Sequence, residues 1–353
     1  MRQLPLNSWK AEFQSAFKTL PPLYDFLGWS LPESLKKVSE VYSVFIPQGL
    51  AQKIKDRGPD SALARQFLPH ENELNLQGYH DPIGDQIHSK APQLIHRYPS
   101  RALFTPTTVC PIHCRYCFRK NELNTGEDFF SPDFAQTLEY LKCHPEISEI
   151  IFTGGDPFTL SDEKISFYLE HFSQISSIKD IRFHTRYPTI LPQRITEELV
   201  QVLRSFKKRF RTLSIAIHCN HAEELAPENQ ESILKIQEFN LLSQTVLLKG
   251  VNDNPEALLK LFNLFLDLGV RPYYLHHPDQ VKGGLHFYLP IKDGRKIYHS
   301  LRGHLPGWAL PHYIIDIPQG YGKISAHNPE SLEYSGSLIG LNGEIISAPE
   351  PSY

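Results

Sequence analysis

Three cysteines form the most informative group of residues in the chain. Cys110, Cys114 and Cys117 stand within eight residues of one another, and the 353-residue chain has only two other cysteines. Three thiols cannot all pair as disulfides, and they are one ligand short of a closed four-ligand zinc site. This spacing therefore indicates a metal centre that keeps one coordination position open.

Charged residues elsewhere could bind charged ligands. Arg97 and Arg101 lie four residues apart, where two guanidinium groups could hold a phosphate. Two carboxylates, Asp279 and Asp316, could recognise an ammonium group, which offers three donors and a full charge. Lys323 follows a Gly-x-Gly turn, where backbone without β-carbons can approach a flat cofactor. Taken alone, each residue is more often a surface charge, a loop aspartate or a helix cap.

The predicted elements would bring such residues together. From Arg101 onward, short apolar runs alternate with amphipathic helical segments, a pattern typical of βαβ units with a parallel sheet. This pattern predicts an α/β barrel, open or closed, with about six parallel strands. The predicted strands are 101–107, 149–153, 180–184, 212–218, 243–248 and 271–276, and the helices include 134–143, 162–172, 197–206 and 255–268.

Polar residues follow the ends of these predicted strands. In α/β barrels the loops at the C-terminal strand ends surround one shared mouth, where chemistry takes place. The cysteines follow the first strand, and polar runs begin at Gly154, His184, His218 and His276 after later strands. The sequence therefore predicts a single site at this mouth.

The flanking segments are predicted to have separate roles. Residues 1–95 favour a helical N-terminal extension with helices at 8–16, 32–41 and 48–55, residues 96–290 form the predicted barrel core, and 291–353 form a C-terminal segment. An Asn-Gly pair within 337–346 is typical of a hairpin, which we expect to cover part of the core or an interface.

Composition narrows the class of protein. The chain has 36 basic and 39 acidic residues, a formal net charge of −3 and 41% hydrophobic residues. It therefore has no general positive field for nucleic acid or an anionic membrane. Neither a signal-peptide pattern nor a run of spanning length is present. We expect a cytoplasmic enzyme whose reduced thiols can bind metal.

The cysteine spacing resembles the CxxxCxxC signature of radical S-adenosylmethionine (SAM) enzymes. In that family three thiolates hold three irons of a 4Fe-4S cluster, and the fourth iron binds SAM. From about residue 96 to 323 the chain also resembles lysine 2,3-aminomutases, which implies a radical SAM partial TIM-type barrel. The similar segments are HRYP at 96–99, CRYC at 114–117, GGD at 154–156, LPQRIT at 191–196, GVND at 250–253, LGVRPYY at 268–274 and IDIPQGYGK at 315–323.

The resemblance implies roles for the charged residues. It makes Lys323 the lysine that carries pyridoxal phosphate (PLP), with Arg97 and Arg101 near the phosphate of that cofactor. Arg119 matches the arginine that binds the substrate carboxylate. Asp279 and Asp316 match the aspartates that recognise the ε-ammonium group of lysine.

A second set of residues matches positions near SAM. Gly154 and Gly155 match the strand end whose backbone pairs with the methionine part, and Asp156 matches the acidic residue that follows. His218 and Gln244 match polar positions near the nucleoside. Without the resemblance, a Gly-Gly-Asp-Pro run is a common turn, and a strand-end histidine is usually structural.

The implied reaction moves the α-amino group of L-lysine to the β-carbon and yields β-lysine. A flavodoxin or ferredoxin would act as electron donor. Longer relatives bind zinc between subunits through a C-terminal cysteine tail, whereas no cysteine follows Cys219. The chain thus resembles shorter relatives that make (R)-β-lysine for elongation factor P. Transfer of the product to an elongation factor P ligase and a homo-oligomeric state both stay open.

Other functions are compatible with the same residues. One is a radical SAM aminomutase acting on another amino acid, or a radical enzyme without PLP. The other is a zinc-binding module without catalysis, in which histidines complete the ligand set. Iron and sulfide content distinguishes the zinc module from the radical enzymes.

Overall fold

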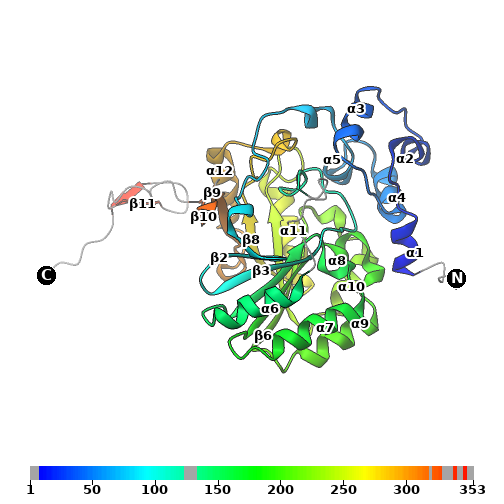
Figure 1. The fold of residues 1–353 in the computed structure, drawn as a ribbon. Coiled ribbons are helices and arrows are strands. Elements are labelled where there is room, and N and C mark those ends of the chain that lie inside the picture. The colour runs from blue at the N-terminus through cyan, green and yellow to red at the C-terminus, as the bar shows by residue number, and fades with distance from the viewer. Residues whose placement is uncertain (1–7, 123–132, 318–319, 328–336, 340–344, 348–353) are drawn as a thin grey trace.

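The fold is built on one large, mostly parallel sheet. The structure is a computed structural model that describes residues 8–122, 133–317, 320–327, 337–339 and 345–347. The sheet has ten strands in chain order, from β1 to β10. Every neighbouring pair from β3 to β9 is parallel, whereas β1, β2 and β10 are antiparallel to their neighbours. Because β1 and β10 are its two edges, the sheet is an open, partial barrel, as predicted (Figure 1).

The strands agree closely with the periodicity of the sequence. The predicted runs 101–107, 212–218 and 271–276 are strands over those residues, and β9 adds a parallel strand beyond the six predicted. The strands of the sheet are β1 (Ser89–Ala91), β2 (Leu94–Tyr98), β3 (Arg101–Thr107), β4 (Glu149–Gly154), β5 (Asp180–Thr185), β6 (Thr212–His218), β7 (Asn240–Val246), β8 (Arg271–His276), β9 (His312–Ile317) and β10 (Gly322–Ser325).

Strand β7 is shifted relative to the predicted run 243–248. Its ladder with β6 begins where Asn240 pairs with Ser214, and the two side chains are hydrogen-bonded at 2.9 Å. It ends early because the side chain of Asn252 accepts the amide of Leu248 at 2.7 Å. The backbone of Leu248 therefore turns away from the sheet.

Helices cover the outside of the sheet. Helices α6 and α9 span the predicted residues, while α7 and α11 differ from the prediction by one residue at the C-terminal end. Side chains of Ser161, Thr196 and Asn254 cap α7, α9 and α11 by accepting backbone amides. The helices are α1 (Trp9–Gln14), α2 (Leu20–Leu27), α3 (Ser34–Val41), α4 (Gln48–Arg57), α5 (Ala62–Phe67), α6 (Phe134–Cys143), α7 (Asp162–Ser173), α8 (Tyr187–Ile190), α9 (Glu197–Phe206), α10 (Pro227–Leu234), α11 (Pro255–Asp267) and α12 (Ile291–Leu301).

Aromatic rings on adjacent strands form the centre of the main core. Phe104, Phe152 and Phe183 are fully buried on β3, β4 and β5. The ring centroids of Phe104 and Phe152 are 5.3 Å apart, and those of Phe152 and Phe183 are 4.4 Å apart. Burying one such side chain contributes roughly 1.5–3 kcal/mol. These contacts keep the strand ends, and so the loops that follow them, in fixed positions.

The N-terminal helices pack on the cysteine loop. A second apolar core joins α2 to α5 with Ile112, and Cys114 packs against it. Backbone amides of His113 and Arg115 donate to the carbonyls of Phe45 and Gln66 at 3.2 and 3.0 Å. The N-terminal helices therefore support the loop between β3 and α6. The division of the chain at residues 95 and 290 stays a prediction.

The C-terminal tail contains a short pair of strands. β11 (Ser337–Ile339) and β12 (Ile345–Ser347) are antiparallel and form a separate two-stranded sheet. The predicted Asn-Gly turn between them lies outside the described residues. Within the described ranges, none of the helices is long and apolar enough to cross a membrane.

Candidate functional site

One cavity of about 270 Å³ is lined by the C-terminal ends of the parallel strands and by residues nearer their starts, such as Arg101 on β3 and Arg182 on β5. It brings together all the residues that the sequence predicted for the site, although these come from distant parts of the chain. Their roles stay predictions. The predicted residues that line it are Arg97, Arg101, Cys110, Cys114, Cys117, Arg119, Gly154, Gly155, Asp156, His218, Gln244, Asp279, Asp316 and Lys323.

The three cysteines lie on the loop that follows β3, directly beside the end of β4. The amides of Gly155 and Asp156 donate to the carbonyls of Thr107 and Val109 at 2.7 and 2.9 Å. A β-carbon at Gly155 would lie 2.4 Å from the carbonyl oxygen of Val109. Gly155 is therefore required because the two backbones touch here, apart from any contact with a cofactor.

The surroundings of the thiols disfavour free thiolates. Burial raises the pKa of Cys110, Cys114 and Cys117, to about 11 for Cys117, and the neighbouring cysteines raise the pKa values of Cys110 and Cys117 further. Three such groups ionise together only if a cation compensates them. Among the described residues, no three Cys, His, Asp or Glu side chains converge on a single ion. A cubane cluster does not need such convergence, because its three thiolates bind three different irons.

Charged side chains of alternating sign form a chain along the cavity. Arg119 contacts Asp85 at 2.6 Å, and Asp85 contacts Arg97 at 3.1 Å. Arg97 contacts Asp316 at 3.6 Å, and Asp316 contacts Lys323 at 2.7 Å. Each carboxylate is thus shared by two cations. A ligand with a charge of its own could take the place of one partner without leaving the other uncompensated.

Lys323 is positioned by the edge of the sheet. It is the direct register partner of Asp316 in the antiparallel pair β9–β10. Its amide donates to the hydroxyl of Tyr98 at 2.8 Å. Gly322 has φ +93°, and a β-carbon there would lie 2.9 Å from the same hydroxyl. The Gly-x-Gly turn is therefore needed for this approach, which brings the amine of Lys323 into the cavity.

Asp279 lies near the same end of the cavity. Burial and the neighbouring charge of Asp316 raise its pKa to about 7. Burial and the charge of Lys323 lower the pKa of His276 to about 4, so this imidazole is neutral. His276 Nδ1 lies 3.9 Å from Asp316. A carboxyl group whose pKa lies near 7 ionises readily when a cationic ligand binds beside it.

Comparison with known proteins agrees with this arrangement. Residues 104–262 match the family model described as the radical SAM superfamily. The chain is 34% identical over 360 residues to the L-lysine 2,3-aminomutase of Methanococcus maripaludis, covering 98% of this chain and 82% of that protein. It is also 34% identical over 280 residues to the L-lysine 2,3-aminomutase of Escherichia coli, covering 78% and 81%. The chain belongs to the lysine 2,3-aminomutase family. The predicted family and fold are thereby confirmed, and the radical SAM superfamily implies SAM and a 4Fe-4S cluster.

In this aminomutase-family chain, Asp156 has clear structural partners. The residue is 5% exposed, and its carboxylate accepts the hydroxyl of Thr185 at 2.8 Å and the amides of Arg186 and Phe158 at 2.6 and 3.0 Å. Burial raises its pKa to about 6. Asp156 thus joins the ends of β4 and β5, and the contact with SAM predicted for it stays a prediction.

His218 and Gln244 lie at neighbouring strand ends. They are register partners in the pair β6–β7. His218 Nε2 is hydrogen-bonded to the hydroxyl of Tyr116 at 2.9 Å, and the two rings stack with centroids 5.8 Å apart. The stacked pair of Tyr116 and His218 therefore lies beside the cysteines, on the side of the cavity where the nucleoside of SAM is predicted to bind.

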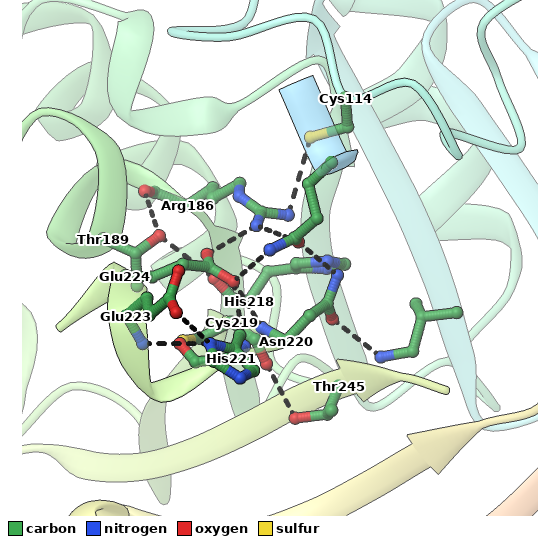
Figure 2. Close-up of polar contacts among 12 residues, drawn as sticks. Cys114, Arg186, Thr189, His218, Cys219, Asn220, His221, Glu223, Glu224 and Thr245 are labelled. Carbon is green, nitrogen blue, oxygen red and sulfur yellow. Dashed lines mark hydrogen bonds and ion pairs between the residues drawn. The ribbon is translucent and has the colours of Figure 1, made fainter. Parts of the chain in front are cut away.

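Several residues of the site were not assigned roles from the sequence. Asp85 and Glu224 gave no signal, because their partners are distant in sequence and each looks like an ordinary loop or helix-end acid. His184 ends the third predicted strand and Arg186 lies just after it, which placed them at the rim without indicating a role. Figure 2 shows Arg186 between Cys114 and Glu224. Tyr116 lies between two cysteines, which was its only signal.

Proposed function

We propose that the protein is a radical SAM, PLP-dependent aminomutase that converts L-lysine to β-lysine. The observation that carries this proposal is the shared cavity, which has the cysteine loop and Lys323 in its wall. Two cofactors that act on one substrate must lie within contact distance of it. The proposal is also supported by the similarity of the chain to proteins named L-lysine 2,3-aminomutase.

The residues fit the groups that such a reaction uses. Cys110, Cys114 and Cys117 would hold the 4Fe-4S cluster and leave one iron for SAM. Lys323 would carry PLP, and Arg97 and Arg101 would hold the phosphate of that cofactor. When bound, the cluster and SAM supply the radical that takes a hydrogen atom from lysine, and PLP supplies the group on which the amino nitrogen moves.

An excess of positive charge suits anionic ligands. This part of the cavity is lined by more cations than acids. The cations are Arg97, Arg101, Arg119, Arg182 and Lys323, and the acids are Asp85, Asp279 and Asp316, of which Asp85 and Asp316 pair with Arg97, Arg119 and Lys323. The guanidinium of Arg101 lies 3.9 Å from the ring centroid of Tyr98. A phosphate and a substrate carboxylate would therefore be attracted, with Arg119 oriented for the latter by Asp85.

The ammonium group of the substrate would take over a contact that Lys323 makes now. The amine of Lys323 lies 2.7 Å from Asp316 and so occupies the place where the ε-ammonium of lysine is predicted to bind. Attachment of Lys323 to PLP would remove this cation from Asp316. Asp316, still paired with Arg97, and Asp279 would then be available to the ammonium group of the substrate, and acidic or apolar side chains would be rejected.

His184 offers a further polar group to a ligand. Its Nε2 is buried and has no hydrogen-bond partner within the described part of the chain. Burial and the neighbouring Arg182 lower the pKa of His184 well below its usual value, so the imidazole is neutral. A buried polar atom without a partner costs free energy, and a bound ligand would satisfy it.

Anaerobic turnover tests the proposal. Protein reconstituted with iron, sulfide and PLP, then given SAM, a reductant and L-lysine, is expected to yield β-lysine by chiral product analysis. Absence of β-lysine from iron-replete, PLP-loaded protein would contradict the proposal. Zinc in place of iron in anaerobically purified protein would favour the binding module, and turnover of another amino acid would favour the other aminomutase. The cytoplasmic location, the electron donor and the use of the product for elongation factor P stay predictions.

A further inference from the structure

A buried arginine contacts the middle cysteine of the three. Arg186 follows β5, is 6% exposed, and donates from Nη1 to the Sγ atom of Cys114 at 3.5 Å. The same nitrogen contacts the hydroxyl of Tyr116, which is hydrogen-bonded to His218. Arg186 therefore touches both a predicted cluster ligand and the stacked pair on the predicted SAM side.

Glu224 holds this guanidinium in place. Arg186 Nη2 donates to Glu224 Oε2 at 2.5 Å and to Gln66 Oε1 at 3.2 Å. The other carboxylate oxygen of Glu224 accepts the amides of Asn220 and His221 at 2.8 and 3.0 Å, as Figure 2 shows in part. Glu224 is 1% exposed. Rigid backbone beyond β6 thus fixes the carboxylate, and the carboxylate fixes Arg186.

The neighbouring arginine serves as an internal comparison. Arg115 directly follows Cys114 in sequence, but its guanidinium donates to Glu73 at 2.5 Å and to the carbonyl of Ser43 at 2.9 Å. Sequence proximity therefore does not direct its charge to the sulfur. The cation that contacts Cys114 instead comes from Arg186, which directly follows β5, and the fold brings it to the sulfur.

Burying an ion pair costs free energy because both charges lose their hydration, so the buried Arg186–Glu224 pair calls for an explanation. Hydrogen bonds and positive charge at a thiolate stabilise an iron–sulfur cluster more in its reduced state, which carries the extra negative charge. We propose that Arg186 is a positioning residue of the cluster site, whose guanidinium, held by Glu224, donates to the Cys114 thiolate and raises the reduction potential of the cluster. The electron itself comes from the one-electron donor. This inference rests on the proposed function, because it requires the cluster.

The test is the midpoint potential of the reconstituted cluster, measured by redox titration with electron paramagnetic resonance. Arg186→Gln removes a cation beside the sulfur, so the ratio of reduced to oxidised cluster at fixed potential should fall about tenfold, which equals ~59 mV for one electron. Glu224→Gln loses the carboxylate that holds the guanidinium on the sulfur, so the potential should shift in the same direction as in Arg186→Gln. Arg186→Lys keeps the charge but loses the fork that reaches Glu224 and Cys114 together, so its potential should lie between those of the wild type and Arg186→Gln.

Arg194→Gln is the matched control. Arg194 is 1% exposed, but its partners are the carbonyls of Phe158 and Leu160 at 2.7 and 3.0 Å and the carboxylate of Asp162 at 2.7 Å. Its loss should destabilise the protein without moving the potential. Iron content and SAM-free spectra are measured for every variant, so that loss of the cluster is not mistaken for a shift.

Two results would overturn the inference. One is an Arg186→Gln protein with wild-type iron content and an unchanged potential. The other is a shift of opposite sign in Arg186→Gln and Glu224→Gln. If the Arg186→Gln protein cannot hold iron, the Glu224→Gln protein provides the test. An unchanged midpoint potential in that protein rejects the inference. A wild-type protein that binds no 4Fe-4S cluster would instead reject the proposed function, so the two failures are distinguishable.

Discussion

The cysteine region and the Lys323 region share one cavity but are held by different kinds of contact. Beside the cysteines, Arg186 and Glu224 form a closed buried pair with side-chain exposures of 6% and 0%. At the other region, Asp85 and Asp316 are each shared between two cations, and the side chain of Lys323 is 26% exposed. The first arrangement suits a permanent cluster. The second can exchange partners, as turnover of a charged substrate requires.

Loss of a cysteine should give the largest effect. Cys117→Ser replaces a soft thiolate by a hydroxyl that binds iron poorly, so we expect loss of the cluster and of β-lysine formation to background. Iron and sulfide analysis with anaerobic turnover measures both. Cys143→Ser is the control, because Cys143 is exposed and lies outside the cavity. An iron-replete and active Cys117→Ser protein would remove this cysteine from the cluster ligands.

Replacement of Lys323 should affect the second region alone. Lys323→Ala is expected to lower turnover by roughly 10³-fold or more, because the covalent attachment of PLP is lost. The cluster should form normally, which iron content and its visible spectrum report. Lys323→Arg keeps a cation beside Asp316 but cannot carry PLP. It therefore separates the effect of the lost PLP attachment from the effect of the lost charge. If both variants retain the absorbance of lysine-bound PLP, another lysine carries the cofactor.

Neutralising Asp316 should weaken substrate binding more than it alters the cluster. Asp316→Asn removes the partner of an incoming ammonium, so we expect KM for lysine to rise by about 10²-fold. Breaking the buried pair with Arg97 and Lys323 should also lower the free energy of unfolding by about 3–5 kcal/mol. Denaturant unfolding and steady-state kinetics measure the two effects. A KM equal to that of the unmodified protein would exclude a contact between Asp316 and the substrate.

The raised pKa of Asp279 predicts a pH dependence. Since its pKa in the folded protein is about 7, the carboxyl is increasingly protonated, and so uncharged, below that pH. Attraction for the substrate ammonium is then lost, and kcat/KM should fall about tenfold per pH unit below 7. The Asp279→Asn protein should have a lower kcat/KM that no longer changes with pH below 7. Identical pH profiles for the two proteins would assign the titration to another group.

A glycine substitution gives the smallest effect and tests the packing beside the cysteines. Gly155→Ala would place a β-carbon 2.4 Å from the carbonyl of Val109, so we expect destabilisation of about 1–3 kcal/mol. Gly303→Ala is the matched control, because a β-carbon there meets no atom within 4 Å. Thermal unfolding compares them. Equal stability of the two variants would show that the cysteine loop can move away from β4.

Local patterns predicted most of the framework. Strand periodicity located β3, β6 and β8, and turn-forming glycines located the approach to Lys323, because these signals depend on neighbouring residues. The position of β7 depended on its pairing with β6, where Asn240 meets Ser214 across 26 residues. The pairing of β9 with β10 was missed although it is local, since its register partners Asp316 and Lys323 are only seven residues apart.

The sequence by itself determined the types of the reactive groups, and the tertiary structure decided which charges surround them. The spacing of Cys110, Cys114 and Cys117 is local, so it could be recognised without a fold. The acids are different, because Asp85 meets Arg119 across 34 residues and Glu224 meets Arg186 across 38. Electrostatic energy depends on distance in space and on burial, and the sheet establishes both by bringing separate strand ends to one cavity.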